Sequence, residues 1–144
     1  IFEEIKGDRM EIKGDKSQMF QPSKNFTDLI AWKKAHEFVL EVYKVTKQFP
    51  AEERFALCSQ FQRAAVSIPA NIAEGYKKLS KADKLRFMNI AQGSLEECRY
   101  YIILSNDLLY INSNDYDYLN MRLEEASKFL NSYIKGLVEK KFND

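Results

Sequence analysis

The chain has 144 residues, of which 45% are hydrophobic and 30% charged, and its formal net charge is +1. This length and balance are typical of one globular domain that buries a core without disulfides, and they exclude a disordered chain. A net charge close to zero argues against indiscriminate binding of polyanions, so a bound nucleic acid would need a local basic patch.

The first 24 residues differ in character from the rest. The pentapeptide Glu-Ile-Lys-Gly-Asp occurs at positions 4–8 and again at 11–15, without a helical apolar stripe. We predict a flexible or loosely docked extension over residues 1–24, in which a short hairpin is one conformation, and a helical domain over residues 25–144. No apolar run approaches the ~20 residues of a membrane span. There is also no signal-peptide core, and we therefore expect a cytoplasmic protein.

Apolar residues at helical spacing predict a first helix from about Asp28 to Gln48, capped by Thr27 or Asp28. Trp32 and His36 fall on its apolar face. His36 is the only histidine of the chain, so we interpret it as a core or interface residue rather than a catalytic base.

A second helix is predicted from Ala51 to about Gly75. Pro69 lies in its interior, where it removes one backbone hydrogen bond and crowds the carbonyl of Ala65. We therefore predict a kink at Pro69.

Two further helices complete the domain. The third begins after Ser80, a good N-cap, and ends at the break 112–114, and the fourth runs from Asp115 to about Val138. Four long amphipathic segments joined by short loops predict an all-α fold, an antiparallel up-down-up-down four-helix bundle. The third helix is apolar around much of its circumference, notably at 100–104, and a homo-oligomeric interface would cover this surplus.

The second helix carries a polar stripe on one side. Its residues recur at spacings of three and four, and they are Gln60, Arg63, Ser67, Asn71 and Glu74. One interpretation is a binding groove in which Arg63 meets phosphate and Asn71 offers its amide. The other is a structural seam inside the bundle or between subunits, where Ser67 satisfies backbone released by Pro69 and the two charged residues find partners.

A basic cluster spans the loop between the second and third helices. It consists of Lys77, Lys78, Lys81, Lys84 and Arg86. Lys33 and Lys34 of the first helix are candidates to join it in space. Five positive charges in ten residues predict phosphate binding that weakens with salt, whereas solubility alone is the simpler interpretation of loop lysines.

The sequence offers no residues for catalysis or for a cofactor. There is no Gly-rich phosphate loop and no nucleophile elbow. The acidic pairs 96–97 and 124–125 lack the Glu-x-x-His partners of a metal-binding bundle. Tyr and Phe fall at helical core positions, which argues against a stacking platform for bases. Cys58 and Cys98 lie among apolar residues of predicted helices, and we predict that both are buried free thiols. We therefore expect that the protein has no enzymatic activity and binds no metal or cofactor.

The stretch from Gln62 to Gly75, QRAAVSIPANIAEG, resembles the signature of the four-helix-bundle proteins encoded within intervening sequences of bacterial 23S ribosomal RNA genes. Segments 29–35, 49–50, 53–57 and 90–97 resemble other parts of the same family. The likeness spans roughly residues 26–138.

The resemblance implies a non-enzymatic bundle that assembles as a ring, a homopentamer. A related branch comprises the accessory variability proteins of diversity-generating retroelements, which are similar bundles that bind a reverse transcriptase and RNA. Those proteins are strongly basic, and this chain departs from them at +1. We therefore expect a ring that binds RNA or a protein–RNA complex through the basic cluster. The alternative is a protein-interaction scaffold or an accessory subunit of a reverse transcriptase.

Overall fold

Four long helices form most of the protein. The computed structural model describes residues 3–6, 9–12 and 20–140, with side chains over 22–140. The helices are α1 (Ile30–Thr46), α2 (Leu57–Lys77), α3 (Lys81–Asp107) and α4 (Ser113–Glu139), and the short 3₁₀ helices η2 (Phe26–Asp28) and η3 (Ala51–Glu53) precede α1 and α2. The predicted all-α four-helix bundle is confirmed, with a small sheet added before it.

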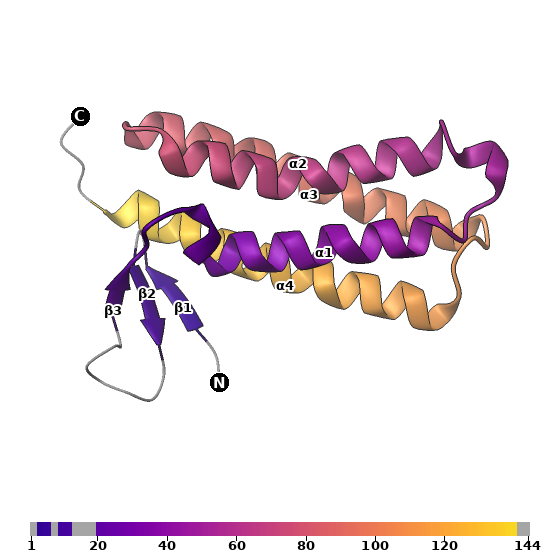
Figure 1. The fold of residues 1–144 in the computed structure, drawn as a ribbon, viewed down its shortest axis with the longest axis horizontal. Helices are drawn as coiled ribbons and strands as arrows, with labels where there is room; N and C mark the ends of the chain where they lie inside the picture. Colours follow the sequence, from indigo (N-terminus) through magenta and orange to yellow (C-terminus); the bar gives the residue numbers. More distant parts are fainter. Residues whose placement is uncertain (1–2, 7–8, 13–19, 141–144) are drawn as a thin grey trace.

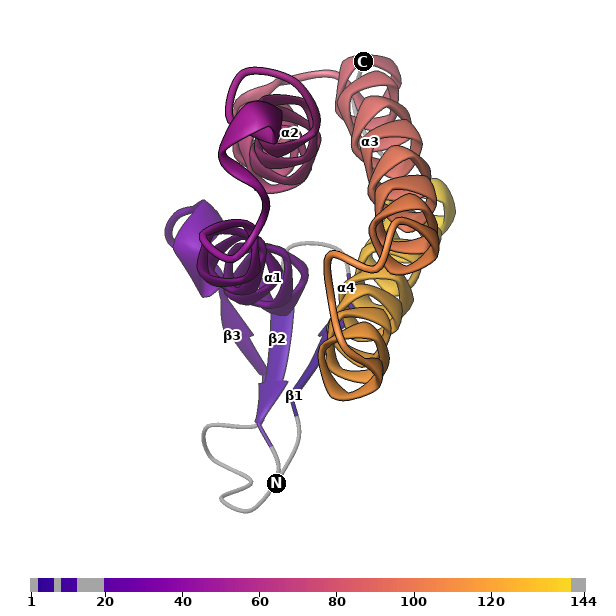
Figure 2. The ribbon, with the colours of Figure 1, turned by 90° about the vertical axis from the view of Figure 1, so that its right-hand side faces the viewer.

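Each helix lies beside its neighbours in sequence. Figure 1 shows α1 running from the left end to the right, α2 returning, and α3 and α4 repeating this pattern. α4 packs against α1 as well as α3, and this contact closes the bundle. Seen from the end, the helices occupy four corners, with α1 and α3 at diagonal positions (Figure 2).

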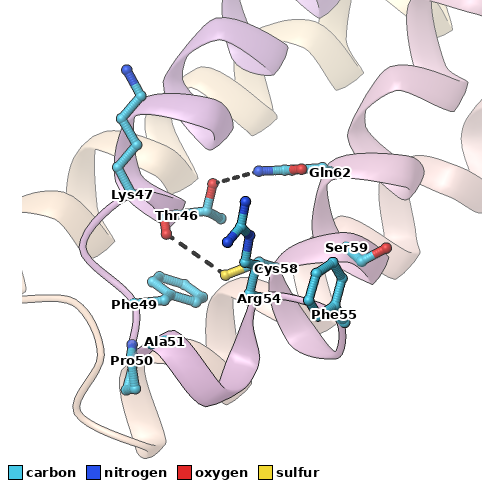
Figure 3. Close-up of a pocket in the computed structure, with 10 residues that line it drawn as sticks. All are labelled: Thr46, Lys47, Phe49, Pro50, Ala51, Arg54, Phe55, Cys58, Ser59 and Gln62. Atoms are coloured by element: carbon cyan, nitrogen blue, oxygen red, sulfur yellow. Dashed lines mark hydrogen bonds between the residues drawn. The ribbon is translucent and has the colours of Figure 1, made fainter.

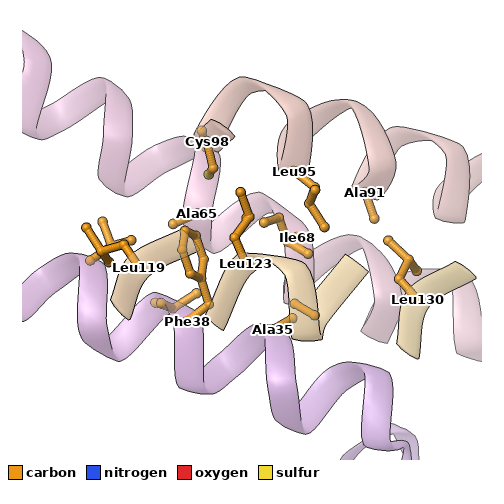
Figure 4. Packing of buried hydrophobic residues seen from close by; sticks show 14 of the residues in the cluster. Ala35, Phe38, Ala65, Ile68, Ala91, Leu95, Cys98, Leu119, Leu123 and Leu130 are labelled. Atoms are coloured by element: carbon orange, nitrogen blue, oxygen red, sulfur yellow. The ribbon is translucent and has the colours of Figure 1, made fainter. Parts of the chain in front are cut away.

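All four helices contribute to one apolar core (Figure 4). Phe38 of α1, Ile68 of α2, Leu95 of α3 and Leu123 of α4 are each no more than 2% exposed. On α4 the buried residues recur every three or four positions, which keeps them on one face. They are Leu119, Leu123, Ala126, Leu130, Tyr133 and Leu137. Packing of this kind is the main source of helix stability in a bundle.

The beginning of the first helix differs from the prediction. Asn25 accepts the Thr27 backbone N–H at 2.8 Å, Asp28 accepts the Lys24 N–H at 2.8 Å, and these bonds cap η2. The bond from Lys24 is also the main reason that the pKa of Asp28 is lowered. Leu29 then adopts an extended backbone before α1. Thr27 and Asp28 therefore belong to η2, and the prediction that either caps the long helix is wrong.

The second helix also begins later than predicted. Residues from Ala51 form η3, and Ala56, with φ −118° and ψ −103°, lies outside the helical region just before α2 begins at Leu57. The Glu53 carboxylate accepts the Leu57 N–H at 3.3 Å and the Tyr110 hydroxyl at 2.7 Å. The hydrogen bond to Glu53 raises the pKa of Tyr110 to about 12. Glu53 thus links the start of α2 to the connection between α3 and α4.

Pro69 is buried within α2, and the helix continues past it to Lys77. A proline cannot donate the backbone hydrogen bond that the Ala65 carbonyl would otherwise accept. The predicted kink at this position stays a prediction.

Side-chain caps begin both of the last two helices. Ser80 accepts the Asp83 N–H at 3.2 Å, so the predicted N-cap of α3 is confirmed. Asn112 accepts the Asp115 N–H at 2.8 Å in the same way. α4 therefore begins at Ser113, two residues earlier than predicted.

The connection between α3 and α4 is longer than predicted, because α3 ends at Asp107. Leu109 has a φ of 62° and is 86% exposed. A left-handed backbone is unfavourable for a residue with a Cβ atom, and it stops the helix here.

Three short strands precede the bundle. β1 (Glu3–Lys6) pairs antiparallel with β2 (Arg9–Ile12), and β2 pairs antiparallel with β3 (Phe20–Pro22). β1 lies against α4 and α1. Both copies of the repeated pentapeptide lie partly outside the described residues, and the predicted flexibility of residues 1–24 stays a prediction.

Candidate nucleic-acid interface

The predicted basic cluster lies at one end of the bundle, where α2 connects to α3 (Figure 1). Lys77 is the last residue of α2 and Lys78 is its C-cap. Lys81 begins α3, and Arg86 follows one turn later. The helix dipole favours a positive charge at a helix C-terminus, so Lys77 stabilises the end of α2.

Two of the five cluster residues are held by the protein itself. Lys84 is only 7% exposed, and its ammonium donates to the Tyr76 carbonyl at 2.5 Å. Lys81 donates to the carbonyls of Val138 and Lys140 at 2.6 and 3.2 Å, at the C-terminus of α4. Both bonds satisfy carbonyls that helix ends leave without a partner, so these lysines also stabilise the fold.

The other three cations are more available. Lys78 and Arg86 lie over the ring of Phe87, with 5.1 Å from Nζ and 4.7 Å from Cζ to its centroid. Arg86 also forms an exposed ion pair with Asp83 at 3.7 Å. Lys77 is exposed. Within the described part of the chain, neither Lys77 nor Lys78 forms an ion pair.

The lysines of α1 do not both extend this cluster. Lys34 pairs with Glu37 and Glu125, each at 3.6 Å, and Arg122 bonds the same two carboxylates at 2.9 and 3.1 Å. This network links α1 to α4, so the charge of Lys34 is partnered there. Lys33 forms no ion pair with a described carboxylate.

Part of the polar stripe of α2 faces α3. The hydroxyls of Ser67 and Ser94 are 2.7 Å apart, and Asn71 donates to the Ser67 carbonyl and hydroxyl at 2.7 and 2.9 Å. Tyr101 donates to Gln60 at 3.3 Å. These contacts form a seam between the two helices.

Parts of the stripe differ from what the structural interpretation predicts. The bonds of Ser67 run to Ser94 and Asn71 rather than to backbone released by Pro69. Arg63 and Glu74 are exposed, and neither forms an ion pair with another described residue.

Apolar side chains are exposed on all four helices, and they include a group on α3 and a group on α1. On α3, Tyr100 is 56% exposed, and Ile90 and Ile103 are also open to solvent. On α1, Leu40 is 56% exposed, next to Tyr43. Since α1 and α3 are at diagonal corners (Figure 2), these groups lie on different sides. The prediction of surplus apolar surface on the third helix is confirmed, and the second group was not anticipated.

Trp32 packs against the core from the apolar face of α1, as predicted, whereas His36 lies outside the core. His36 is exposed and stacks on half-buried Trp32, with 5.0 Å between the ring centroids. Of the two predicted positions of His36, the core is therefore wrong, and the interface stays a prediction. Its helical spacing matched the apolar stripe, but the position lies at the margin of the buried face.

A pocket of about 620 Å³ lies between the end of α1 and the start of α2 (Figure 3). Gln62 donates to the Thr46 hydroxyl at 3.0 Å, and the Cys58 thiol to the Thr46 carbonyl at 3.6 Å. Burial raises the pKa of Cys58. The cations that line the pocket, Lys47 and Arg54, are exposed, and it lies at the end opposite the basic cluster.

Residues 3–6, 9–12 and 20–140 contain no group of three or more His, Cys, Asp or Glu side chains suited to a metal ion. No helix in this part of the chain is both long and apolar enough to cross a membrane. Both cysteines are buried and unpaired.

Comparison with known proteins agrees with the resemblance seen in the sequence. Residues 27–132 match the family described as 23S rRNA-intervening sequence protein. A protein of unknown function from the S23 ribosomal protein family of Bacteroides thetaiotaomicron VPI-5482 has a similar crystal structure, with a TM-score of 0.69 and 31% identity. The match covers 75% of this chain and 97% of that one. No curated protein matches. The chain belongs to the family of 23S rRNA-intervening sequence proteins.

Proposed function

We propose that this protein is a non-enzymatic, ring-forming four-helix bundle that binds RNA, or a protein–RNA complex, through the basic cluster. The observation that carries the proposal is the position of the available cations. Lys77, Lys78 and Arg86 gather where α2 meets α3, and the two lysines have no described carboxylate partner. Phosphate groups are the natural partners of such cations.

The exposed apolar groups support the ring. A closed ring needs two different surfaces on each subunit, so that one face of a copy meets the other face of the next. The groups on α1 and α3, around Leu40 and Tyr100, meet this requirement because they lie on different sides. We propose a homopentamer, the size that the family resemblance implies.

The ring and the basic cluster would act together. If subunits stand side by side with their helices parallel to the ring axis, every copy presents its α2–α3 connection on the same rim. A few cations per subunit then become a multivalent surface, which binds more tightly than one copy alone.

Charge reversal tests the cluster. The triple variant Lys77→Glu, Lys78→Glu, Arg86→Glu keeps the two lysines that hold the fold. A matched triple, Lys44→Glu, Lys47→Glu, Lys128→Glu, changes exposed cations elsewhere by the same net charge. We expect only the cluster variant to weaken RNA binding, and to reduce the salt dependence by about one unit of slope per lost phosphate contact. Equal binding by both triples would refute the assignment.

The second candidate is a protein-interaction scaffold, including an accessory subunit of a reverse transcriptase in a diversity-generating retroelement. The exposed apolar groups on α1 and α3 favour it. Light scattering with structured RNA at low and high salt separates the two. A complex that gains mass with RNA only at low salt supports RNA binding, whereas a ring indifferent to RNA favours the scaffold.

A further inference from the structure

The start of α1 carries an aromatic pair that the basic cluster does not explain. Trp32 and His36 are one turn apart, which places both side chains on the same face of the helix. Their rings are almost parallel, with an interplanar angle of 8° and 5.0 Å between centroids. His36 is exposed, and one face of its imidazole lies against the indole.

A third aromatic residue, Phe26, holds the pair in place. Phe26 meets Trp32 edge to face, with centroids 5.3 Å apart and an angle of 71°. Phe26 belongs to η2, whose conformation is fixed by the capping box of Asn25 and Asp28. The orientation of the indole is therefore set by local structure, which lowers the entropy cost of stacking a further ring on the pair.

The same region is tied to the end of α2 that carries the basic cluster. The hydroxyl groups of Ser23 and Tyr76 are 3.1 Å apart, and the Tyr76 hydroxyl also donates to the Ser23 carbonyl at 3.1 Å. Lys77 follows Tyr76 directly. Figure 1 shows η2 and the start of α1 at the same end of the bundle as the α2–α3 connection.

We infer that Trp32 and His36 form a stacking site for an unpaired nucleobase of an RNA whose phosphates contact the basic cluster. An aromatic ring beside cations is the combination by which proteins hold single-stranded nucleic acid. Bases within a duplex are already stacked, so the site selects unpaired segments. This inference rests on the proposed RNA binding and specifies the kind of RNA.

Trp32 provides the assay, because it is the only tryptophan in the chain. A single-stranded oligonucleotide of uridines and adenines should quench its fluorescence upon binding. Inorganic polyphosphate of similar charge should bind the lysines without this quenching, because it has no base to stack. Equal quenching by both ligands would overturn the inference.

Substitutions of His36 test the stacking geometry. His36→Ala should weaken binding of the oligonucleotide about 5- to 150-fold, the range seen on removing one stacked base contact, and leave polyphosphate binding unchanged. His36→Phe should restore binding, because it keeps a flat ring. Gln48→Ala, at an exposed and uncharged position just after α1, is the control and should bind as the unchanged protein does.

The remaining outcomes separate this inference from the proposed function. RNA binding that depends on Lys77 and Lys78 but leaves Trp32 fluorescence unchanged would overturn the stacking site alone. Absence of RNA binding would overturn both. Trp32 fluorescence that changes with protein concentration, without RNA, would place the pair in a contact between copies and overturn the inference.

Discussion

Gly75 sits where α2 packs closely against α3, and its replacement by alanine tests that packing. A Cβ atom at Gly75 would lie 2.5 Å from the Met88 methyl carbon and 2.7 Å from Phe87 Cβ. The methionine end can move at little cost. Phe87 Cβ cannot, since it is attached directly to the α3 backbone. We therefore expect Gly75→Ala to push the two helices apart.

The magnitude follows from two opposing effects. Overpacking of a core typically costs about 1–3 kcal/mol. Alanine is about 1 kcal/mol better than glycine inside a helix, and less near a helix end, where Gly75 lies. The expected net loss is about 1–2 kcal/mol in the free energy of unfolding. For a chain of this size it corresponds to a fall of about 3–8 °C in Tm.

Gly93 of α3 is the matched control, because a Cβ atom there meets no atom within 4 Å. Gly93→Ala has only the gain in helix propensity and should stabilise the protein by about 1 kcal/mol. Urea unfolding followed by circular dichroism measures both variants. If Gly75→Ala were as stable as Gly93→Ala, the close approach of α2 and α3 would be refuted.

Four further substitutions test local features. Ser80→Ala removes the α3 cap and should cost about 1 kcal/mol in urea unfolding; an unchanged midpoint would refute the capping role. Lys84→Met keeps the buried stem but removes the ammonium, and should cost about 1.5–3 kcal/mol, whereas unaltered stability would mean that its hydrogen bond contributes nothing. The pKa of Tyr110 is raised to about 12 by its bond to Glu53, so this contribution to stability is complete below pH 10 and is lost as the pH rises through 12. Thermal unfolding of Tyr110→Phe should lack this decline, and identical pH profiles would contradict it. Pro69→Ala should leave a folded helical protein, with at most about 3 kcal/mol gained, and should change the oligomer mass in light scattering if a kink shapes the interface. An unchanged mass would count against that role.

The sequence predicts the four helices well, but it predicts the first turns of α1 and α2 poorly. Periodicity identifies α3 and α4 because they are long and begin at strong caps, Ser80 and Asn112. The starts of α1 and α2 depend instead on which backbone N–H group each nearby carboxylate bonds. The Asp28 carboxylate accepts the backbone N–H of Lys24, at the start of η2. The Glu53 carboxylate can reach the Leu57 N–H because the residues before α2 form the 3₁₀ helix η3. Local sequence does not distinguish these choices.

The candidate site is predicted in part, for a similar reason. The sequence locates the basic cluster at the α2–α3 connection but does not show which cations are available. Lys84 is buried only because the first turn of α3 packs on the end of α2, and Lys81 is held only because α4 ends nearby. The exposure of His36 beside Trp32 was missed because helical spacing does not reveal where the buried face ends.

The low net charge of the chain is compatible with RNA binding, because its charges are not evenly mixed. In the middle of the bundle, some cations are paired with carboxylates, as where Arg122 bonds Glu37 and where Arg99 bonds Glu124. At the α2–α3 end, Lys77 and Lys78 have no such partner among the described residues. A total of +1 is therefore compatible with a local excess of positive charge at this end. The phosphates of a bound RNA would interact with the local charge and not with the net charge of the chain, because salt screening limits interactions between exposed charges to about 10 Å at 0.1 M salt. A ring that places several such ends on one rim would concentrate positive charge further, without any subunit becoming basic as a whole.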